Sequence, residues 1–288
     1  MADSATVEEL KELQTEHGTL RYYDVGDPSA PPLLLLHGSG PGVTGWRNFG
    51  ANLPALSQHF RCLILEFPGF GVSEATKRHP LAAALPATIA FLDGLGLDQV
   101  DVIGNSMGGI VGTRLAIAQP ERVRRLVTVG GMGRNILSPY PGEGLVRLQE
   151  FVDDPSRERL VQWLHSMVFN RDIVTDAMIE ERWEQAMEPA TLASSRMMYS
   201  RAAFEAMEAF QAQSPEPPYW AELHKISAEV LITWGRDDRV SPIDMALLPM
   251  RTIPHVELHT LPNCGHWAMI EQKEAWEATV LAFLTRGR

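Results

Sequence analysis

Residues 100–118 constrain the fold of this chain more than any other segment. Residues 100–104 (VDVIG) favour a strand, residues 105–109 (NSMGG) favour a tight turn, and residues 110–118 favour a helix that ends before Gln119 and Pro120. A short, mostly apolar strand that leads at once into a helix is typical of a parallel sheet whose two faces are both covered. The segment therefore predicts an α/β protein.

Residues 104–108 (GNSMG) match the pattern G-x-S-x-G. Flanking glycines allow the chain to reverse where a Cβ atom would clash, so Ser106 can take a strained conformation with its hydroxyl above the sheet. The helix start behind it supplies free backbone N–H groups and the positive end of a helix dipole. The pattern recurs by chance, but its position between a strand and a helix makes Ser106 the candidate nucleophile.

Strand-like and helical segments alternate through most of the chain. Residues 15–26 read as a hairpin around a turn at His17 and Gly18. Further strands are expected at residues 33–37, 61–67, 125–129, 229–234 and 256–261, and helices at residues 86–95 and 271–285. This alternation predicts one mostly parallel sheet with helices on both faces.

Residues 138–222 interrupt the alternation. The segment contains no strand-like run, is helical in pattern, and ends in a proline-rich stretch (SPEPPYW). We expect residues 1–137 and 223–288 to form the core domain and residues 138–222 to form a helical lid over the active end of the strands. The alternative is a set of ordinary helices that pack on one face of the sheet.

A serine hydroxyl needs a base to accept its proton, so the nine histidines must be sorted. His266 lies in a loop between a predicted strand and the last helix, which suits a base. His37 precedes a glycine-rich loop and is more typical of a structural residue. The others lie in turns, helices or strands without a supporting pattern and are expected to have surface or structural roles.

The acid that orients the base should follow a strand ahead of His266. Residues 229–234 form that strand, and Asp237 and Asp238 follow it. The spacing G-x-x-D-x-x-x-P, which ends at Pro242, favours Asp238, with Asp237 as the second choice. The acid would hold the tautomer of the imidazole and stabilise its protonated form. The order Ser, Asp, His along the chain is the one used by α/β-hydrolase folds.

An oxyanion intermediate also needs hydrogen-bond donors. The backbone N–H of Met107 is one candidate, and the loop at residues 37–40 (HGSG) offers a second, at Ser39. The sequence contains no G-x-x-x-x-G-K-[ST], which argues against a nucleotide-binding phosphate loop. No His, Cys or Glu cluster has metal-ligand spacing. We therefore expect no cofactor and no metal.

Charge and cysteine content narrow the partners and the compartment. The net charge of −11 disfavours nucleic acid and anionic membranes, because both bind clustered positive charge. No run approaches the roughly 18 apolar residues of a membrane span. The first residues are acidic where a signal peptide would be basic. Two cysteines, Cys62 and Cys264, suit a reducing cytoplasm, which is the expected location.

Four motifs together resemble one family, the meta-cleavage product hydrolases of the α/β-hydrolase fold, which hydrolyse C–C bonds in the catabolism of aromatic compounds. The resemblance extends over nearly the whole chain. Asparagine before the nucleophile, in place of the histidine of general esterases, and the run S-G-P-G are its most specific elements. The motifs are residues 36–42 (LHGSGPG) with Gly45, Trp46 and Asn48; residues 104–109 (GNSMGG); residues 234–239 (WGRDDR); and residues 264–267 (CGHW).

The resemblance implies a 2-hydroxy-6-oxo-hexa-2,4-dienoate substrate, cleaved after ketonisation to 2-hydroxypenta-2,4-dienoate and a carboxylic acid. It implies that Arg182, in the lid, binds the substrate carboxylate, that Asn48 and Asn105 bond to the dienoate oxygens, and that Trp267 walls the pocket. The glycines of the loop, Gly38 and Gly40, would also line the substrate. Attack by Ser106 and attack by water both stay open. Relatives of this kind tend to form dimers or larger homo-oligomers.

Two other functions fit the same motifs. A carboxylesterase or perhydrolase would use the same triad, but Arg182 would then have no carboxylate to bind. A non-catalytic, ligand-binding member of the fold would have no need to keep the whole triad. Arg182 could instead be a solvated helix residue flanked by Glu181 and Glu184. One departure from relatives is Glu66, where they usually carry aspartate; we expect that side chain to shape a turn.

Overall fold

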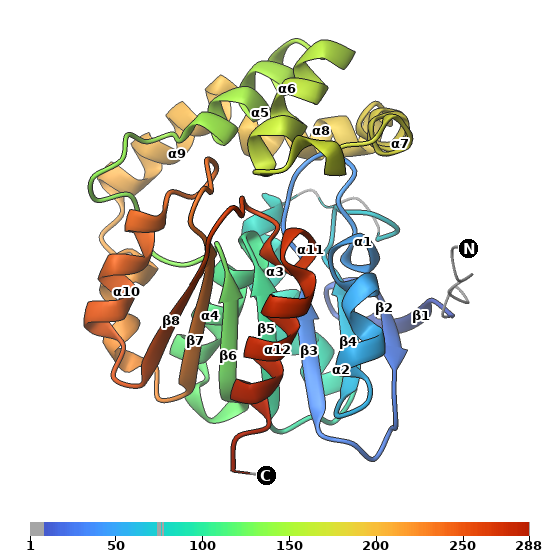
Figure 1. The fold of residues 1–288 in the computed structure, drawn as a ribbon, viewed down its shortest axis with the longest axis vertical. Helices are drawn as coiled ribbons and strands as arrows, with labels where there is room; N and C mark the ends of the chain where they lie inside the picture. Colours follow the sequence, from blue (N-terminus) through green and yellow to red (C-terminus); the bar gives the residue numbers. More distant parts are fainter. Residues whose placement is uncertain (1–8, 74–75, 77, 288) are drawn as a thin grey trace.

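The structure is a computed structural model that describes residues 9–73, 76 and 78–287. Its centre is an eight-stranded sheet with the order β1-β2-β4-β3-β5-β6-β7-β8 (Figure 1). The strands of the described chain are β1 (Lys11–Thr15), β2 (Gly18–Val25), β3 (Pro32–Leu36), β4 (Arg61–Glu66), β5 (Val100–Asn105), β6 (Val123–Val129), β7 (Glu229–Gly235) and β8 (Val256–Leu261). β2 pairs antiparallel with β1 and β4, and the other pairs are parallel. The predicted α/β class is confirmed.

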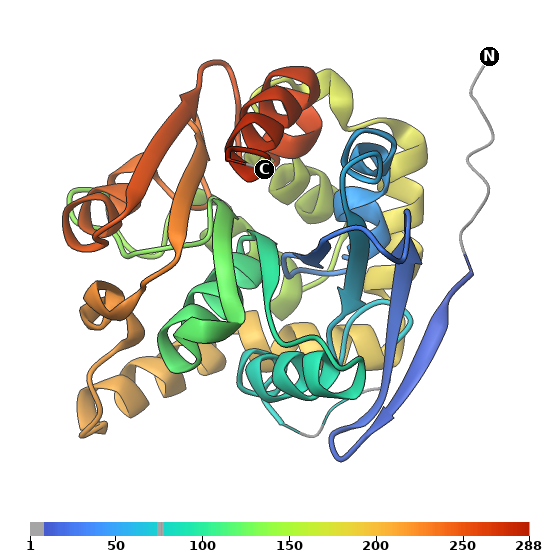
Figure 2. The ribbon, with the colours of Figure 1, turned by 90° about the horizontal axis from the view of Figure 1, so that it is seen from below.

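Helices cover both faces of this sheet. Figure 2, seen along the strands, places α1 (Gly45–Phe49), α2 (Leu53–Leu56) and α12 (Lys273–Leu284) on one side. α3 (Pro80–Gly94) and α4 (Met107–Ala118) lie on the other. α10 (Leu247–Thr252) packs near β8, and α11 (Ala268–Glu271) precedes α12. A parallel sheet needs this double cover because its central strands are apolar on both faces.

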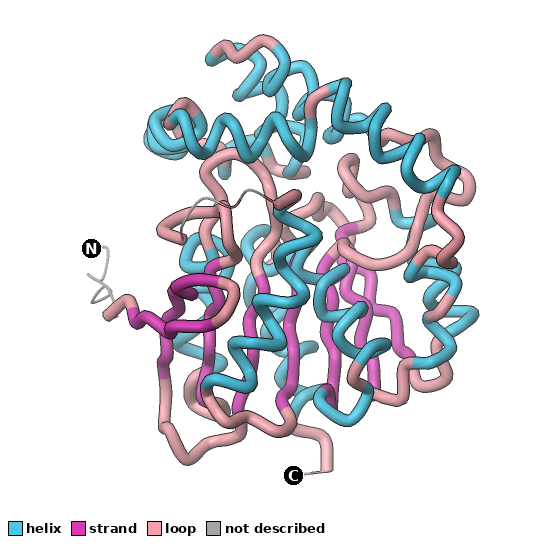
Figure 3. The backbone as a smooth tube through the Cα atoms, turned by 180° about the vertical axis from the view of Figure 1, so that it is seen from behind, coloured by secondary structure: helices cyan, strands magenta, loops and turns pink. Residues whose placement is uncertain are grey.

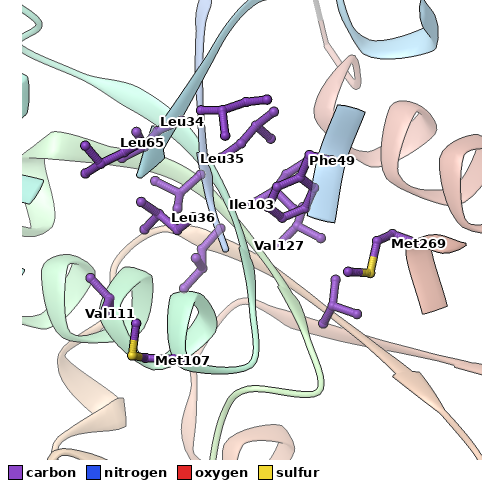
Figure 4. Close-up of a cluster of buried hydrophobic side chains, with 14 of the residues drawn as sticks. Leu34, Leu35, Leu36, Phe49, Leu65, Ile103, Met107, Val111, Val127 and Met269 are labelled. Carbon is purple, nitrogen blue, oxygen red and sulfur yellow. The ribbon is translucent and has the colours of Figure 1, made fainter. Parts of the chain in front are cut away.

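The side chains of the central strands fill the two layers between sheet and helices. The four leucines 33–36 of β3 are fully buried, as an unalternating apolar run predicts. Figure 4 shows Ile103 and Val127 near Phe49 and Met269 on one side of the sheet. Met107 and Val111 of α4 lie on the opposite side. The strand ends that carry the candidate residues are therefore fixed by packing on two faces.

Five helices follow β6 and lie across the carboxyl end of the parallel strands (Figures 1 and 3). They are α5 (Glu143–Asp153), α6 (Arg157–Met167), α7 (Asp176–Ala186), α8 (Pro189–Tyr199) and α9 (Arg201–Gln213). The chain returns to the sheet at β7, which pairs with β6. Short 3₁₀ turns connect several of these elements. They lie at Gly50–Asn52, Pro120–Arg122, Arg171–Ile173, Tyr219–Ala221, Leu223–Lys225 and Ile243–Ala246.

Two helices differ from their predicted bounds. α3 begins at Pro80, six residues before the predicted start, and contains Pro86 in its interior. Proline is favoured in the first turn, so Pro80 takes the position that the sequence suggested for Pro86. The last predicted helix, residues 271–285, corresponds to α12, which begins two residues later because the backbone of Gln272 lies outside the helical region (φ −123°, ψ 47°). Among the helices of the described residues, none combines the length and the apolar character that crossing a membrane requires.

Candidate active site

The turn after β5 holds Ser106 in a strained conformation. Its φ of 51° and ψ of −114° are rare for a residue with a side chain. A Cβ atom on Gly104 would lie 2.3 Å from the Gly108 carbonyl oxygen, and one on Gly108 would lie 2.0 Å from the Leu36 oxygen. Both glycines are therefore required because backbone approaches backbone. The sequence predicted this turn from the same two glycines.

The start of α4 presents backbone donors beside Ser106. Met107 is the first residue of the helix, so its N–H has no partner within the helix. The Ser106 N–H donates to the Val129 carbonyl at 2.8 Å, and the Asn105 side chain donates to the same oxygen at 3.2 Å. These bonds fix the turn against β6. The Met107 N–H stays the predicted oxyanion donor.

His266 and Asp238 lie side by side on the loops after β8 and β7. His266 Nδ1 is 2.7 Å from Asp238 Oδ2, and both side chains are buried. The other carboxylate oxygen, Oδ1, accepts bonds from the N–H groups of Val240 and Ser241 at 2.8 and 2.9 Å. A carboxylate held in this way accepts the Nδ1 proton, which leaves Nε2 of His266 as a free base.

Asp237, the second choice for the acid, points elsewhere. Its carboxylate pairs with Arg236 at 3.3 Å and accepts a 3.4 Å bond from the Cys264 N–H. The two neighbouring aspartates therefore have different partners and different roles. Asp238 contacts the imidazole, and Asp237 braces the loop that carries it.

Two glycines after β6 bring the nucleophile and the base together. A Cβ atom on Gly130 would lie 3.1 Å from Asp238 Oδ2 and from His266 Nδ1, and one on Gly131 would lie 2.1 Å from the Ser106 carbonyl oxygen. Gly130 also has a φ of +58°. Among the described residues, no hydrogen bond links the Ser106 hydroxyl to His266, a contact that often tightens only when substrate binds. Sequence reasoning missed both glycines, although the run GG after a strand was the available signal.

The loop at residues 38–42 faces Ser106 from β3. The Gly38 N–H donates to Asn48 Oδ1 at 2.7 Å, so the carbonyl of Asn48 fixes the loop and its Nδ2 is the group that could donate to a ligand. A Cβ atom on Gly38 would lie 2.7 Å from Asn105 Oδ1. The predicted residues Gly38, Asn48 and Asn105 are therefore neighbours. Ser39 is partly exposed, and its hydroxyl bonds to Tyr199 of α8.

His37 lies behind this loop as a structural residue. Its Nε2 accepts a bond from the Phe67 N–H at 3.0 Å, so Nδ1 carries the proton and donates to the Gly38 carbonyl at 2.6 Å. Burial lowers the pKa of His37 to about 4, which keeps the ring neutral. Both ring nitrogens are engaged with backbone, and neither is available as a base.

Glu66, at the end of β4, binds the start of α1. Its Oε1 accepts bonds from the N–H groups of Gly45 and Trp46 at 2.8 and 3.3 Å. The side chain is fully buried, and its Oε2 has no hydrogen-bond partner among the described residues. Burial raises the pKa of Glu66 to about 7 against the opposing effect of these bonds. Since α1 carries Asn48, Glu66 supports the loop through that helix.

The raised pKa of Glu66 makes a prediction about stability. From the ordinary value of 4.5 to the folded value of about 7, the unfolded chain loses this proton and the folded chain keeps it. The free energy of unfolding should therefore fall across this window as pH rises. Glu66→Gln retains an oxygen acceptor and cannot ionise, so its melting temperature should fall less than that of the natural protein between pH 5 and pH 8. An equal fall in melting temperature from pH 5 to pH 8 in the two proteins would contradict the prediction.

Arg182 of α7 is buried beside Trp267. Only 5% of Arg182 is exposed, and its guanidinium carbon lies 5.7 Å from the centre of the Trp267 ring. Its one hydrogen bond among the described residues, at 3.4 Å, goes to the Pro41 carbonyl. Within the described part of the chain, no carboxylate forms an ion pair with it. Burial, followed by the charge of Arg47, lowers the pKa of Arg182 to about 10.

The interpretation of Arg182 as a solvated residue is wrong. Glu181, its neighbour in sequence, binds Arg47 of α1, and Glu184 is exposed. A buried guanidinium without a carboxylate carries a desolvation cost that an anionic ligand would offset. The side chain therefore has the properties of a carboxylate-binding group.

Glu271 links the His266 loop to the lid helices. Its Oε1 accepts a bond from the Gly265 N–H at 2.7 Å, and its Oε2 accepts one from the Phe169 N–H at 2.7 Å. The His266 N–H donates to the Met167 carbonyl, at the end of α6, at 2.7 Å. The base is thus held by the lid as well as by the sheet. No sequence pattern marked Glu271 for this role.

Comparisons with known proteins identify the family of this chain. A family model described as "alpha/beta hydrolase fold" matches residues 31–273. The 2-hydroxy-6-oxo-6-phenylhexa-2,4-dienoate hydrolase of Burkholderia cepacia is 33% identical over 270 residues, which cover 92% of this chain and 90% of that protein. The 2-hydroxy-6-oxononadienedioate/2-hydroxy-6-oxononatrienedioate hydrolase of Klebsiella pneumoniae is 36% identical over 276 residues, with 93% and 92% covered.

Solved structures give the same answer. A Ser-to-Ala mutant of the meta-cleavage product hydrolase CumD from Pseudomonas fluorescens IP01, complexed with acetates, superposes with a TM-score of 0.85 at 27% identity. The match covers 96% of this chain and 98% of that one. The fold, the relatives and the shared length confirm the resemblance noted in the sequence. The chain belongs to the alpha/beta hydrolase fold family and, within it, to the meta-cleavage product hydrolases, which are C–C bond hydrolases.

Proposed function

We propose that this protein hydrolyses the C5–C6 bond of a 2-hydroxy-6-oxo-hexa-2,4-dienoate. Ketonisation of the dienol places a proton on C5. The oxygen of water then ends on C6, which becomes a carboxylic acid, while the electron pair of the broken bond is taken up by the dienol of 2-hydroxypenta-2,4-dienoate. Atoms balance with one water consumed, and the reaction needs no redox partner.

The residues of the site suit the steps of this reaction. Ser106 and His266 supply the nucleophile and its base, with Asp238 holding the imidazole through the 2.7 Å contact. The backbone N–H groups of Met107 and Ser39 would bind the oxyanion that forms at C6. The roles of these residues are part of the proposal.

The dienoate end of the substrate would lie under the lid. Arg182 would form a two-point ion pair with the C1 carboxylate, for which a planar guanidinium is well shaped. Asn48 and Asn105 would bond to the dienoate oxygens, with Gly38 and Gly40 lining the same side. Trp267 would wall the pocket next to the base and keep the guanidinium in place.

The burial of Arg182 without an acidic partner carries this proposal. A carboxylesterase that acts on neutral esters has no use for an unpaired buried cation, whereas every 2-hydroxy-dienoate brings a carboxylate. We also propose that residues 138–222 act as the lid subdomain, because they carry Arg182 over the strand ends. The two cysteines are both free and buried, which supports the proposal that the protein works in the reducing cytoplasm. A homo-oligomer is a separate part of the proposal.

Turnover of a coloured dienol tests the proposed reaction. 2-Hydroxy-6-oxo-6-phenylhexa-2,4-dienoate should lose its visible absorbance when mixed with the protein, and benzoate and 2-hydroxypenta-2,4-dienoate should form in equal amounts by chromatography. The chromatographic measurement is needed because ketonisation alone also removes the colour. A kcat/KM far higher for p-nitrophenyl esters than for the dienol would favour the esterase instead.

Arg182→Gln tests the carboxylate contact. Loss of a charged hydrogen-bonded pair costs about 1.5–3 kcal/mol, so KM for the acid should rise by roughly 10- to 100-fold. KM for the neutral methyl ester of the same dienol should change by less than about threefold. Arg157→Gln is the matched control. Arg157 also lies over a tryptophan of the lid, 5.4 Å from Trp183, but it pairs with Glu180 at the surface. Equal losses for the acid and its ester in Arg182→Gln would exclude the pairing.

A further inference from the structure

The loop at residues 38–42 is covered by three different lid helices. A Cβ atom on Gly40 would lie 3.0 Å from the ring of Trp163 in α6. One on Gly42 would lie 3.0 Å from Gln185 Oε1 in α7. The loop has space for neither side chain because the lid helices approach its backbone directly. Its position is therefore set from above by the lid as well as from below by β3.

Two arginines add hydrogen bonds between the loop and the lid. Arg47 of α1 donates to the Gly42 carbonyl at 3.1 Å and also binds Glu181 and Gln185 of α7. Arg182 of α7 reaches the Pro41 carbonyl at 3.4 Å. These contacts hold the far end of the loop, two and three residues after the predicted oxyanion donor. They do not involve Ser39 itself.

Tyr199 makes the lid contact at Ser39. The tyrosine is the last residue of α8, its exposed fraction is 9%, and its hydroxyl forms a hydrogen bond with Ser39 Oγ. Burial raises the pKa of Tyr199 to about 12, so the phenol stays neutral and keeps its proton at any pH at which the enzyme would work. It is the one lid side chain with a hydrogen bond to Ser39 among those of the described residues.

We propose that Tyr199 is a positioning residue for the oxyanion hole: its hydroxyl holds Ser39 in place and so aims the Ser39 N–H at the reacting carbonyl. The inference rests on the proposed function in taking Ser39 as an oxyanion donor. An oxyanion hole works because its donors are fixed before charge develops, and a small displacement weakens them. The lid would thus complete the hole only when α8 is seated over the loop.

Tyr199→Phe removes the hydroxyl and keeps the ring that packs in the lid. Removal of one oxyanion donor typically lowers kcat by about 10²–10³-fold, and a displaced donor should cost less, about 10-fold. KM should change by less than about twofold, because the contact serves the transition state and not the ground state. Tyr219→Phe is the matched control: Tyr219 is also a phenol with a raised pKa, but it donates to the Gly133 carbonyl at 3.1 Å, away from the loop.

A double-variant comparison separates positioning from general damage. Ser39→Ala removes the other half of the hydrogen bond and keeps the backbone N–H. If Tyr199 acts through Ser39, the double variant should be no slower than the slower single variant, since both changes break one contact. Affinity for a boronic acid that adds to Ser106 should fall with kcat, while affinity for the dienoate product should not. Additive losses, or a wild-type kcat in Tyr199→Phe, would overturn the inference.

The same variants should be measured on p-nitrophenyl acetate. An oxyanion forms in ester hydrolysis as well as in C–C hydrolysis, so the kcat loss in Tyr199→Phe should appear with both substrates. If the natural protein hydrolyses the ester but not the dienol, the proposed function is refuted. The role of Tyr199 can then still be tested with the ester. A loss confined to the dienol, with normal ester hydrolysis, would refute the positioning role alone.

Discussion

Ser106→Ala should lower product formation by about 10³-fold or more, because removal of one member of a catalytic triad typically has an effect of this size. Ser106 is the residue that the backbone of the β5–α4 turn holds at a φ of 51°, and alanine can occupy the same turn with no new contact. The measurement is the initial rate of carboxylic acid formation from the dienol, read by chromatography.

The control for this variant is its fold. Circular dichroism and melting temperature should match those of the natural protein within a few degrees, since only one oxygen atom is removed. Binding of the dienol should persist, because the proposed contacts of Arg182 are intact. Product formation near the natural rate in a folded variant would end the assignment of Ser106 as nucleophile.

Asp238→Asn should lower kcat by about 10⁴-fold, as the equivalent change does in a serine protease. The hydrogen bonds of Asp238 explain why. Oδ1 accepts from the N–H groups of Val240 and Ser241, so the oxygen of an asparagine would stay there and its NH₂ group would face His266. That group donates, and it would force the imidazole proton from Nδ1 to Nε2. The base would then have no lone pair toward Ser106.

Asp237→Asn is the control that the chain itself provides. The change is chemically identical and one residue away, but Asp237 braces Cys264 and Arg236 and does not touch the imidazole. Its kcat should stay within about threefold of the natural value, an effect of the size typical of a substitution away from special features. Comparable losses in the two variants would show that the loop, and not the orientation of His266, sets the rate.

The sequence contained enough to predict the sheet and the candidate triad. Apolar runs without alternation mark buried parallel strands, and the candidate residues follow strands at fixed distances. The G-x-S-x-G turn, the loop before the last helix and the spacing of residues 235–242 identified Ser106, His266 and Asp238 from local pattern alone. Asp238 was favoured over Asp237 by spacing, and the structure shows which of the two contacts His266.

The contacts that span the molecule were not predictable in this way. Gly130 and Gly131 matter because strands far apart in sequence converge there, and Tyr199 matters because α8 crosses a loop 160 residues earlier. The burial of Arg182 was undecidable from its neighbours, since two flanking glutamates suggest solvent. The local pattern of residues along a chain does not show which helices, strands and loops contact one another, so these features are visible only in the folded structure.

The position of the helical segment between β6 and β7 affects how the substrate preference of such a protein can evolve. The segment leaves the sheet after β6 and returns at β7, and these two strands pair directly in parallel. A change in the length or composition of the segment therefore leaves the order of the strands unchanged. Substrate preference can therefore drift by exchange of this whole segment, as in a chimera with a relative, while the machinery for bond breaking is inherited unchanged. A transplanted segment would also have to restore the contacts between the lid and the core, among them the Tyr199 hydroxyl at Ser39, the Met167 carbonyl at His266 and the partners of Arg47.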